Sequence, residues 1–133
     1  MNTQTIITAD DHPLLLKGLN DFLIEKGVNP VIGELLQQMN LPIESIQHFA
    51  IHPGGRKILE ALEHSLNISK AQNKAAYETL RNYGNMSSVT ILFVLQYLWN
   101  NLNTTHHQDK ILSMAFGPGL TLESALLSVN FTE

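Results

Sequence analysis

Apolar residues recur along the chain at two spacings, one typical of helices and one typical of strands. Between residues 56 and 66 they share one face of a helix, at Ile58, Leu59, Leu62 and Leu66. The shorter run from Ile46 to His52 lacks that period and is typical of a buried strand. By these criteria the sequence predicts helices over 14–26, 31–40, 56–66, 69–83 and 89–99, and strands over 5–8, 46–52, 111–116 and 122–129.

The start of the second helix is ambiguous in the sequence. Residues 28–32 fit either a weak strand or the lead into the helix over 31–40. Pro30 cannot donate a hydrogen bond to a neighbouring strand, so we favour the helix. Its predicted buried face consists of Ile32, Leu35, Leu36 and Met39.

The fourth and fifth predicted helices, over 69–83 and 89–99, carry specific predictions about which side chains are buried. Ser69 and Gln72 have the spacing of a capping box, so the helix is predicted to begin at Ser69. Its predicted buried stripe consists of Ala71, Ala75, Ala76, Leu80 and Tyr83. The helix over 89–99 is apolar nearly all round, which predicts burial on several sides and places Tyr97 and Trp99 in the core.

The order of the elements predicts the fold class. Strands alternate with helices until two strands follow each other around Gly117-Pro118-Gly119, which is typical of a hairpin. The expected fold is α/β: a layered structure with a mixed sheet and a C-terminal β-hairpin. A length of 133 residues favours one folded unit.

Composition narrows the function classes. Hydrophobic residues make up 44% and charged residues 15% of the chain, and no run of about 18 apolar residues occurs, so no membrane partner is expected. The net charge of −4 disfavours nucleic-acid binding. No cysteine is present, which excludes disulfides, thiolate zinc sites and a cysteine nucleophile within these residues. Residues 1–4 lack the basic start of a signal peptide, so a cytoplasmic location is expected.

Three glycine-containing loops carry the candidate chemistry: 52–55, 84–88 and 117–119. An imidazole from His52 and an amide from Asn85, at strand ends and helix starts, can both donate hydrogen bonds to one carbonyl oxygen. The alternative readings are that His52 is a structural turn residue, that Asn85 shapes a helix start and that Gly117-Pro118-Gly119 is only a turn.

The residues around these loops add a resemblance. Phe49-Ala50-Ile51-His52-Pro53-Gly54-Gly55, Tyr83-Gly84-Asn85-Met86-Ser87-Ser88 and Ala115-Phe116-Gly117-Pro118-Gly119-Leu120-Thr121 resemble, in order and separation, three motifs of the chalcone synthase-like family. These are type III polyketide synthases of thiolase fold. The resemblance covers about residues 30–133 and implies a partial thiolase-like domain of an acyltransferase family.

The resemblance implies a role for each matched residue. His52 would be the catalytic histidine, which pairs with a cysteine thiolate and helps hold a thioester carbonyl. Asn85 would polarise the same carbonyl while malonyl-CoA loses carbon dioxide. Gly117, Pro118 and Gly119 would shape the wall of the substrate cavity. Acyl-CoA and malonyl-CoA are the implied substrates, no cofactor is expected, and the implied partner is a second copy or a cysteine-bearing chain.

The missing cysteine changes the functional expectation. The family attacks with a cysteine from its N-terminal half, which this chain lacks, so no acyl-enzyme is expected from the chain alone. A truncated, acyltransferase-family domain that needs a complementing partner is the first interpretation. A non-catalytic remnant or interaction protein is the alternative.

Residues 1–29 resemble a different family. The run Thr5-Ile6-Ile7-Thr8-Ala9-Asp10-Asp11-His12-Pro13, with the helix after it, is similar to the start of response-regulator receiver domains. That resemblance implies magnesium at Asp10 and Asp11, and a truncated receiver in phosphorelay signalling is a further alternative. The other reading is that Asp11 caps a helix and Asp10 is solvated. Residues 1–29 correspond to only the first β–α unit of a receiver, so they are not expected to form an independent domain, and the acceptor aspartate of that family is missing.

A metal site is not expected. His106 and His107 lie next to Asp109, but adjacent histidines in an extended segment point in opposite directions. The segment from 100 to 109 is therefore predicted to be a polar surface loop. The sequence suggests no partner for His48 or His64.

Overall fold

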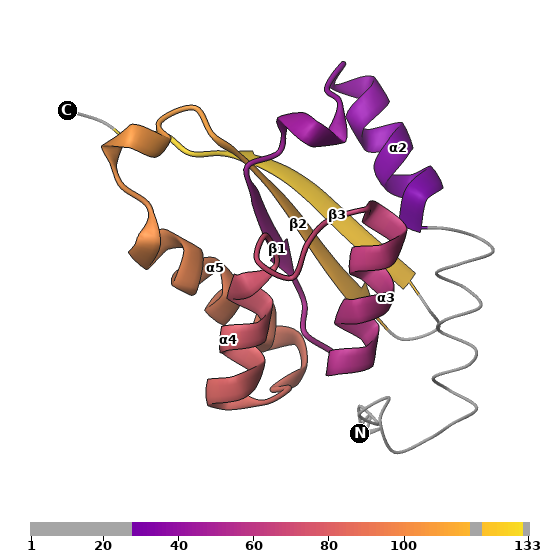
Figure 1. Ribbon diagram of the computed structural model, residues 1–133, viewed down its shortest axis with the longest axis vertical. Coiled ribbons are helices and arrows are strands. Elements are labelled where there is room, and N and C mark those ends of the chain that lie inside the picture. The colour runs from indigo at the N-terminus through magenta and orange to yellow at the C-terminus, as the bar shows by residue number, and fades with distance from the viewer. Residues whose placement is uncertain (1–27, 118–120, 132–133) are drawn as a thin grey trace.

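The computed structural model describes residues 28–117 and 121–131, which contain a three-stranded sheet with helices on both faces (Figure 1). The strand order is β1 (His48–Ile51), β2 (Lys110–Gly117), β3 (Thr121–Ser128). Strand β1 pairs with β2 in parallel and β2 with β3 antiparallel, which confirms the mixed sheet and the C-terminal hairpin. The helices are α2 (Val28–Gln38), α3 (Arg56–Leu66), α4 (Lys74–Tyr83) and α5 (Thr90–Asn101), with single 3₁₀ turns at Ile43–Ser45, Ser87–Val89 and Thr104–His106.

Alternation along β1 divides the core between the two faces of the sheet. Phe49 and Ile51 point into one apolar cluster together with residues of α2 and α3. Ala50, between them, belongs to a second cluster that includes Val94 and Leu98 of α5. Figure 1 shows the same arrangement, with α2 and α3 on one side of the sheet and α4 and α5 on the other. Because successive side chains of β1 point to opposite faces, helices pack on both sides of the sheet and the structure has three layers.

Helix α2 confirms the helical interpretation of its segment, but its boundaries differ from the prediction. It begins at Val28 rather than Val31, because Pro30 falls in the first turn, where a missing N–H costs nothing. Ile32 and Leu36 are buried as predicted. The predicted burial of Met39 is wrong: this residue lies beyond the end of the helix and is 54% exposed.

Helix α4 begins later than predicted. The N–H of Gln72 donates to the Ser69 hydroxyl at 3.2 Å and the N–H of Ser69 to the Gln72 side-chain oxygen at 2.8 Å. These contacts close a turn, and the helix itself starts at Lys74. Because of this offset Ala71 is exposed, and Tyr83 at the other end is 55% exposed, so both were wrongly predicted to be buried.

Helix α5 is buried on one face only. Thr90, Val94 and Leu98 face the interior, whereas Leu92 is 59% and Trp99 73% exposed. The predicted burial on several sides is therefore wrong within the described residues, and Trp99 is not in the core. The exposed residues Val89, Leu92 and Trp99 recur at helical spacing and are called the α5 stripe below.

Some sequence expectations lie outside the described residues. These include the strand over 5–8, the helix over 14–26, and the pair Asp10 and Asp11. Among the helices that the structure does describe, none combines the length and the apolarity needed to cross a bilayer.

Candidate functional site

The end of β1 fixes the backbone of His52. Its N–H donates to the carbonyl of Met114 on β2 at 2.8 Å, and its own carbonyl accepts from the N–H of Gly54 at 3.0 Å. The first bond holds the residue against the sheet, and the second turns the chain sharply toward α3. His52 is 7% exposed, so its imidazole is held in a mostly dry environment.

Burial lowers the pKa of His52 below its ordinary value of 6.5, because the charged imidazolium loses its hydration there. The ring therefore stays neutral near neutral pH and has one N–H that can donate. Within residues 28–117 and 121–131 no hydrogen-bond partner of the ring is found. The ring N–H of His52 can therefore donate a hydrogen bond to a bound ligand.

The lowered pKa predicts loss of stability in acid. Below pH 6.5 the unfolded chain takes up a proton at His52 that the folded chain resists, so unfolding becomes more favourable as the pH falls. Urea titrations at pH 7.5 and 5.5 should show a smaller pH-dependent loss in His52→Gln than in the original chain. Equal losses in both would contradict the buried neutral imidazole.

The loop after α4 fixes the amide of Asn85. Its Oδ1 accepts from the N–H of Ser87 at 3.0 Å and lies 3.5 Å from the Thr90 hydroxyl, whose hydrogen is best placed to donate to the Ser87 carbonyl at 2.8 Å. Ser87 has a φ of +66°, uncommon for a serine, and these bonds hold it there. The carbonyl side of Asn85 is occupied by its own loop, so its NH₂ group points away from that loop.

The NH₂ group of Asn85 reaches the histidine loop. Nδ2 donates to the carbonyl of Gly54 at 3.3 Å, two residues after His52. A Cβ added at Gly54 would lie 3.0 Å from Ile58 Cδ1 and 4.0 Å from His52 Cδ2, so a side chain there would require the end of the Ile58 side chain to shift. The structure thus brings the two predicted loops into direct contact, and one of the two amide hydrogens of Asn85 remains available.

Gly117 lies at the same edge of the sheet. It ends β2, where it pairs with Thr121 of β3. Because β1 and β2 run in parallel, their carboxyl ends meet at one edge, and Gly117 lies beyond the Met114 carbonyl that holds His52. Pro118 and Gly119 fall outside the described residues.

A cavity of about 440 Å³ lies elsewhere, lined by residues of α2, the following turn and the end of α3. Ile32, Leu36 and Leu66 contribute to its wall, and its lining contains neither His52 nor Asn85. It is therefore not the cavity that the resemblance predicts beside Gly117.

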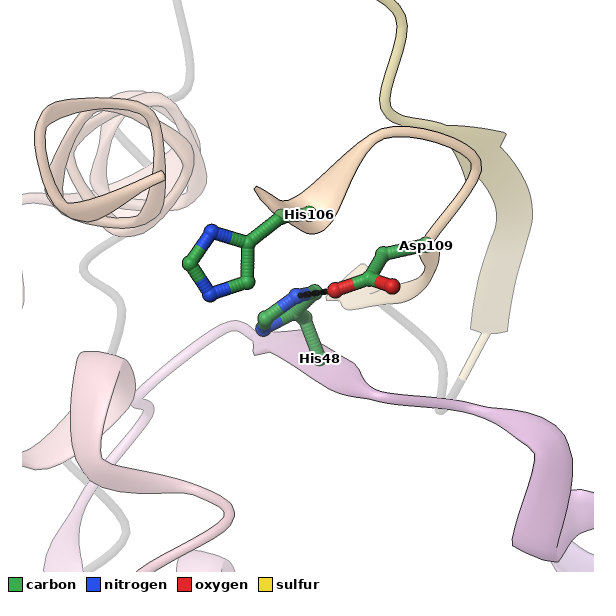
Figure 2. Close-up of side chains that lie close together, drawn as sticks. All are labelled: His48, His106 and Asp109. Carbon is green, nitrogen blue, oxygen red and sulfur yellow. Dashed lines mark hydrogen bonds and ion pairs between the residues drawn. The ribbon is translucent and has the colours of Figure 1, made fainter. Parts of the chain in front are cut away.

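A second cluster lies at the opposite end of β1, where the sequence predicted a polar surface loop and suggested no partner for His48. Figure 2 shows the side chains of His48, His106 and Asp109 converging, with donor atoms all within 4.8 Å of one another. His107 does not join them: its ring contacts the Gln108 side chain and accepts from the N–H of Phe131. His48 and Asp109 are 61 residues apart, so no local spacing signals the cluster.

The chain matches a protein-family model and resembles several known proteins. The family model that matches is described as "Chalcone and stilbene synthases, C-terminal domain" and covers residues 14–130. This range includes residues 14–29, part of the segment that resembles a receiver start. The receiver interpretation of residues 1–29 stays a prediction.

Several relatives are polyketide synthases. "Alpha-pyrone synthesis polyketide synthase-like Pks18" of Mycobacterium tuberculosis is 38% identical over 106 residues, which cover 80% of this chain and 27% of that protein. "Type III polyketide synthase A" of Arabidopsis thaliana is 41% identical over 81 residues, 59% of this chain and 20% of that protein.

A solved structure of a polyketide synthase is also similar to this chain. PKS-I from the brown alga Ectocarpus siliculosus superposes with a TM-score of 0.71 and 25% identity, over 88% of this chain and 31% of that one. This likeness supports the partial thiolase-like fold. The chain spans between 20% and 31% of the length of these three relatives. Because the family model matches residues 14–130, the chain belongs to the chalcone and stilbene synthase family and carries the C-terminal domain of that family.

Proposed function

We propose that His52 and Asn85 hold the thioester carbonyl of malonyl-CoA during decarboxylation and condensation in a type III polyketide synthase. The observation that supports this most is the bond between Asn85 Nδ2 and the Gly54 carbonyl, which places the amide beside the histidine loop. A neutral, buried imidazole and a fixed amide are two donors of the kind that stabilise an oxyanion.

The chemistry follows from those donors. When the carbon–carbon bond to the malonyl carboxylate breaks, carbon dioxide leaves and the electron pair remains as an enolate. Its negative charge collects on the thioester oxygen, where hydrogen bonds from His52 and Asn85 would stabilise it. The enolate carbon then attacks an acyl thioester, forming a carbon–carbon bond and expelling a thiolate.

That acyl group needs a cysteine from outside these 133 residues, which contain none. We place the cysteine on a complementing chain or segment. The α5 stripe supports such a contact, because Leu92 and Trp99 expose apolar surface that a stable isolated domain would cover. The relatives extend well beyond the matched region, which is consistent with a further part of the enzyme.

Reconstitution tests this function. The chain is mixed with the separately produced cysteine-bearing N-terminal half of a homologous synthase, and carbon dioxide release from malonyl-CoA is measured. We expect release from the mixture and none from either part alone. Trp99→Asp should abolish the release by blocking assembly, whereas Leu127→Asp, at an exposed position on β3, should not.

A stable complex without carbon dioxide release would contradict the proposal. It would favour the second candidate, a non-catalytic interaction protein, for which the absence of cysteine is the supporting observation. Release that survives His52→Ala unchanged would show that the activity resides elsewhere.

A further inference from the structure

We propose that His48, His106 and Asp109 form a site for a divalent transition-metal ion, with Zn²⁺ as the favoured occupant. The site is distinct from that of His52 and Asn85. His48 begins β1 and His52 follows its last residue, so about four residues of extended chain, roughly 13 Å, separate the two.

Each of the three side chains is positioned by backbone contacts. His48 is the first residue of β1, paired with Ile111 in the sheet. Asp109 donates its N–H to the His106 carbonyl at 3.0 Å and accepts from the N–H of Val129 at 2.9 Å. These bonds hold the three donors on one side of the segment that leads into β2 (Figure 2).

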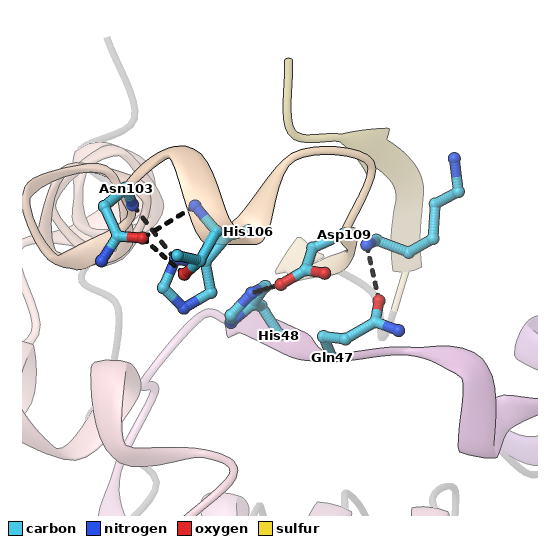
Figure 3. A network of polar contacts seen from close by, with 7 residues as sticks. Gln47, His48, Asn103, His106 and Asp109 are labelled. Atoms are coloured by element: carbon cyan, nitrogen blue, oxygen red, sulfur yellow. Dashed lines mark hydrogen bonds and ion pairs between the residues drawn. The ribbon is translucent and has the colours of Figure 1, made fainter. Parts of the chain in front are cut away.

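The ring of His106 has an anchor of its own. Its Nδ1 accepts from the N–H of Asn103 at 3.1 Å, part of a capping box around the turn Thr104–His106. Figure 3 shows this bond and the neighbouring one, in which the N–H of Lys110 donates to the Gln47 side chain at 2.7 Å. With Nδ1 held on the Asn103 side, Nε2 is the nitrogen directed toward His48 (Figure 2).

The donor set suits zinc. Two imidazoles and one carboxylate are common zinc ligands, and a water molecule would complete a tetrahedron. The side chains of His48 and Asp109 are 18% and 22% exposed, so an ion can enter from solvent. His48 Nε2 and Asp109 Oδ2 are 2.7 Å apart, whereas ligand atoms about 2 Å from one zinc ion lie about 3.3 Å from each other. The pair must therefore open by about half an ångström.

Binding also requires each imidazole to present an unprotonated Nε2. The metal would take the lone pair of His48 Nε2, the nitrogen that now shares a proton with Asp109. At His106 the proton must move from Nε2 to Nδ1, which breaks the bond from the Asn103 N–H. Because a metal binds neutral imidazole and ionised carboxylate, affinity should fall as the pH is lowered.

The location indicates a structural role. A bound ion would link the start of β1 to the loop between α5 and β2, which contains His106 and Asp109. We therefore expect the metal to raise the unfolding temperature of the chain rather than to take part in the reaction at His52.

Titration of the full chain with Zn²⁺ and Co²⁺ tests the site. Calorimetry should give one ion per chain at pH 7.5, with weaker affinity at pH 5.5. His106→Ala and Asp109→Asn should each weaken binding by at least about tenfold and abolish the zinc-dependent rise in unfolding temperature. His107→Ala, next in sequence but outside the cluster, is the matched control and should bind as the original chain does.

The outcomes are separable from those for the proposed enzyme site. His52→Ala should bind zinc normally, and circular dichroism at 25 °C verifies that each variant is folded. Visible absorption of the Co²⁺ form should show tetrahedral coordination. Absence of one-to-one binding at about 1 mM Zn²⁺, equal binding by His106→Ala and His107→Ala, or octahedral Co²⁺ would overturn the proposal.

Discussion

Replacing Asn85 by alanine is expected to slow malonyl-CoA decarboxylation by the assembled synthase by about 10²–10³-fold, the usual cost of losing one oxyanion donor. The reason is the fixed amide: Oδ1 is held by the N–H of Ser87, so the remaining hydrogen on Nδ2 has one direction in which to donate. The measurement is the initial rate of carbon dioxide release at saturating malonyl-CoA.

Asn82→Ala provides the matched control, since Asn82 is an exposed asparagine on the neighbouring α4. It should retain the full rate. Because Asn85→Ala also removes the contact of Oδ1 with the Ser87 N–H, unfolding by urea is measured in parallel. A folded Asn85→Ala variant with an unchanged rate would exclude the amide from the reaction.

Replacing Phe49 by alanine is expected to lower the free energy of unfolding by about 3–5 kcal/mol. Phe49 is 1% exposed at the centre of β1, where it packs in the cluster shared with α2 and α3. Truncation leaves a cavity between the sheet and both helices, and these elements cannot all move to fill it. Since His52 follows the same strand, the loss also loosens the candidate site.

Urea unfolding of the chain at pH 7.5 measures this effect. Leu92→Ala removes a similar apolar side chain from the exposed stripe of α5 and should change the free energy by no more than about 0.5 kcal/mol. If both variants lost a comparable free energy of unfolding, the core would not be where the structure places it.

Local sequence signals predicted much of the fold. The helix over 56–66 was predicted with its observed limits, because four apolar residues share one face and Pro53-Gly54-Gly55 precedes it. The start of α4 was not, because the hydrogen bonds of Ser69 and Gln72 close a turn as readily as they cap a helix. Uniform apolarity in α5 could not reveal which face would be covered within this chain.

The candidate site was predictable only in part. The motifs around His52 and Asn85 gave their order, and their contact through the Gly54 carbonyl appears only in the fold. In the cluster at the other end of β1, only His48 had no sequence signal, because parallel pairing of β1 and β2 brings it to Asp109 across a long separation. His106 and Asp109 were weighed as metal ligands together with His107, which has other partners, and a polar surface loop was predicted in their place.

The most direct test is a crystal structure of the assembled synthase with a non-reactive malonyl thioester bound. The result we expect is a single carbonyl oxygen within about 2.7–3.2 Å of both a ring nitrogen of His52 and Nδ2 of Asn85. A thioester oxygen contacted by only one of them, or by neither, would contradict the proposed function, which requires both side chains to donate to one oxygen.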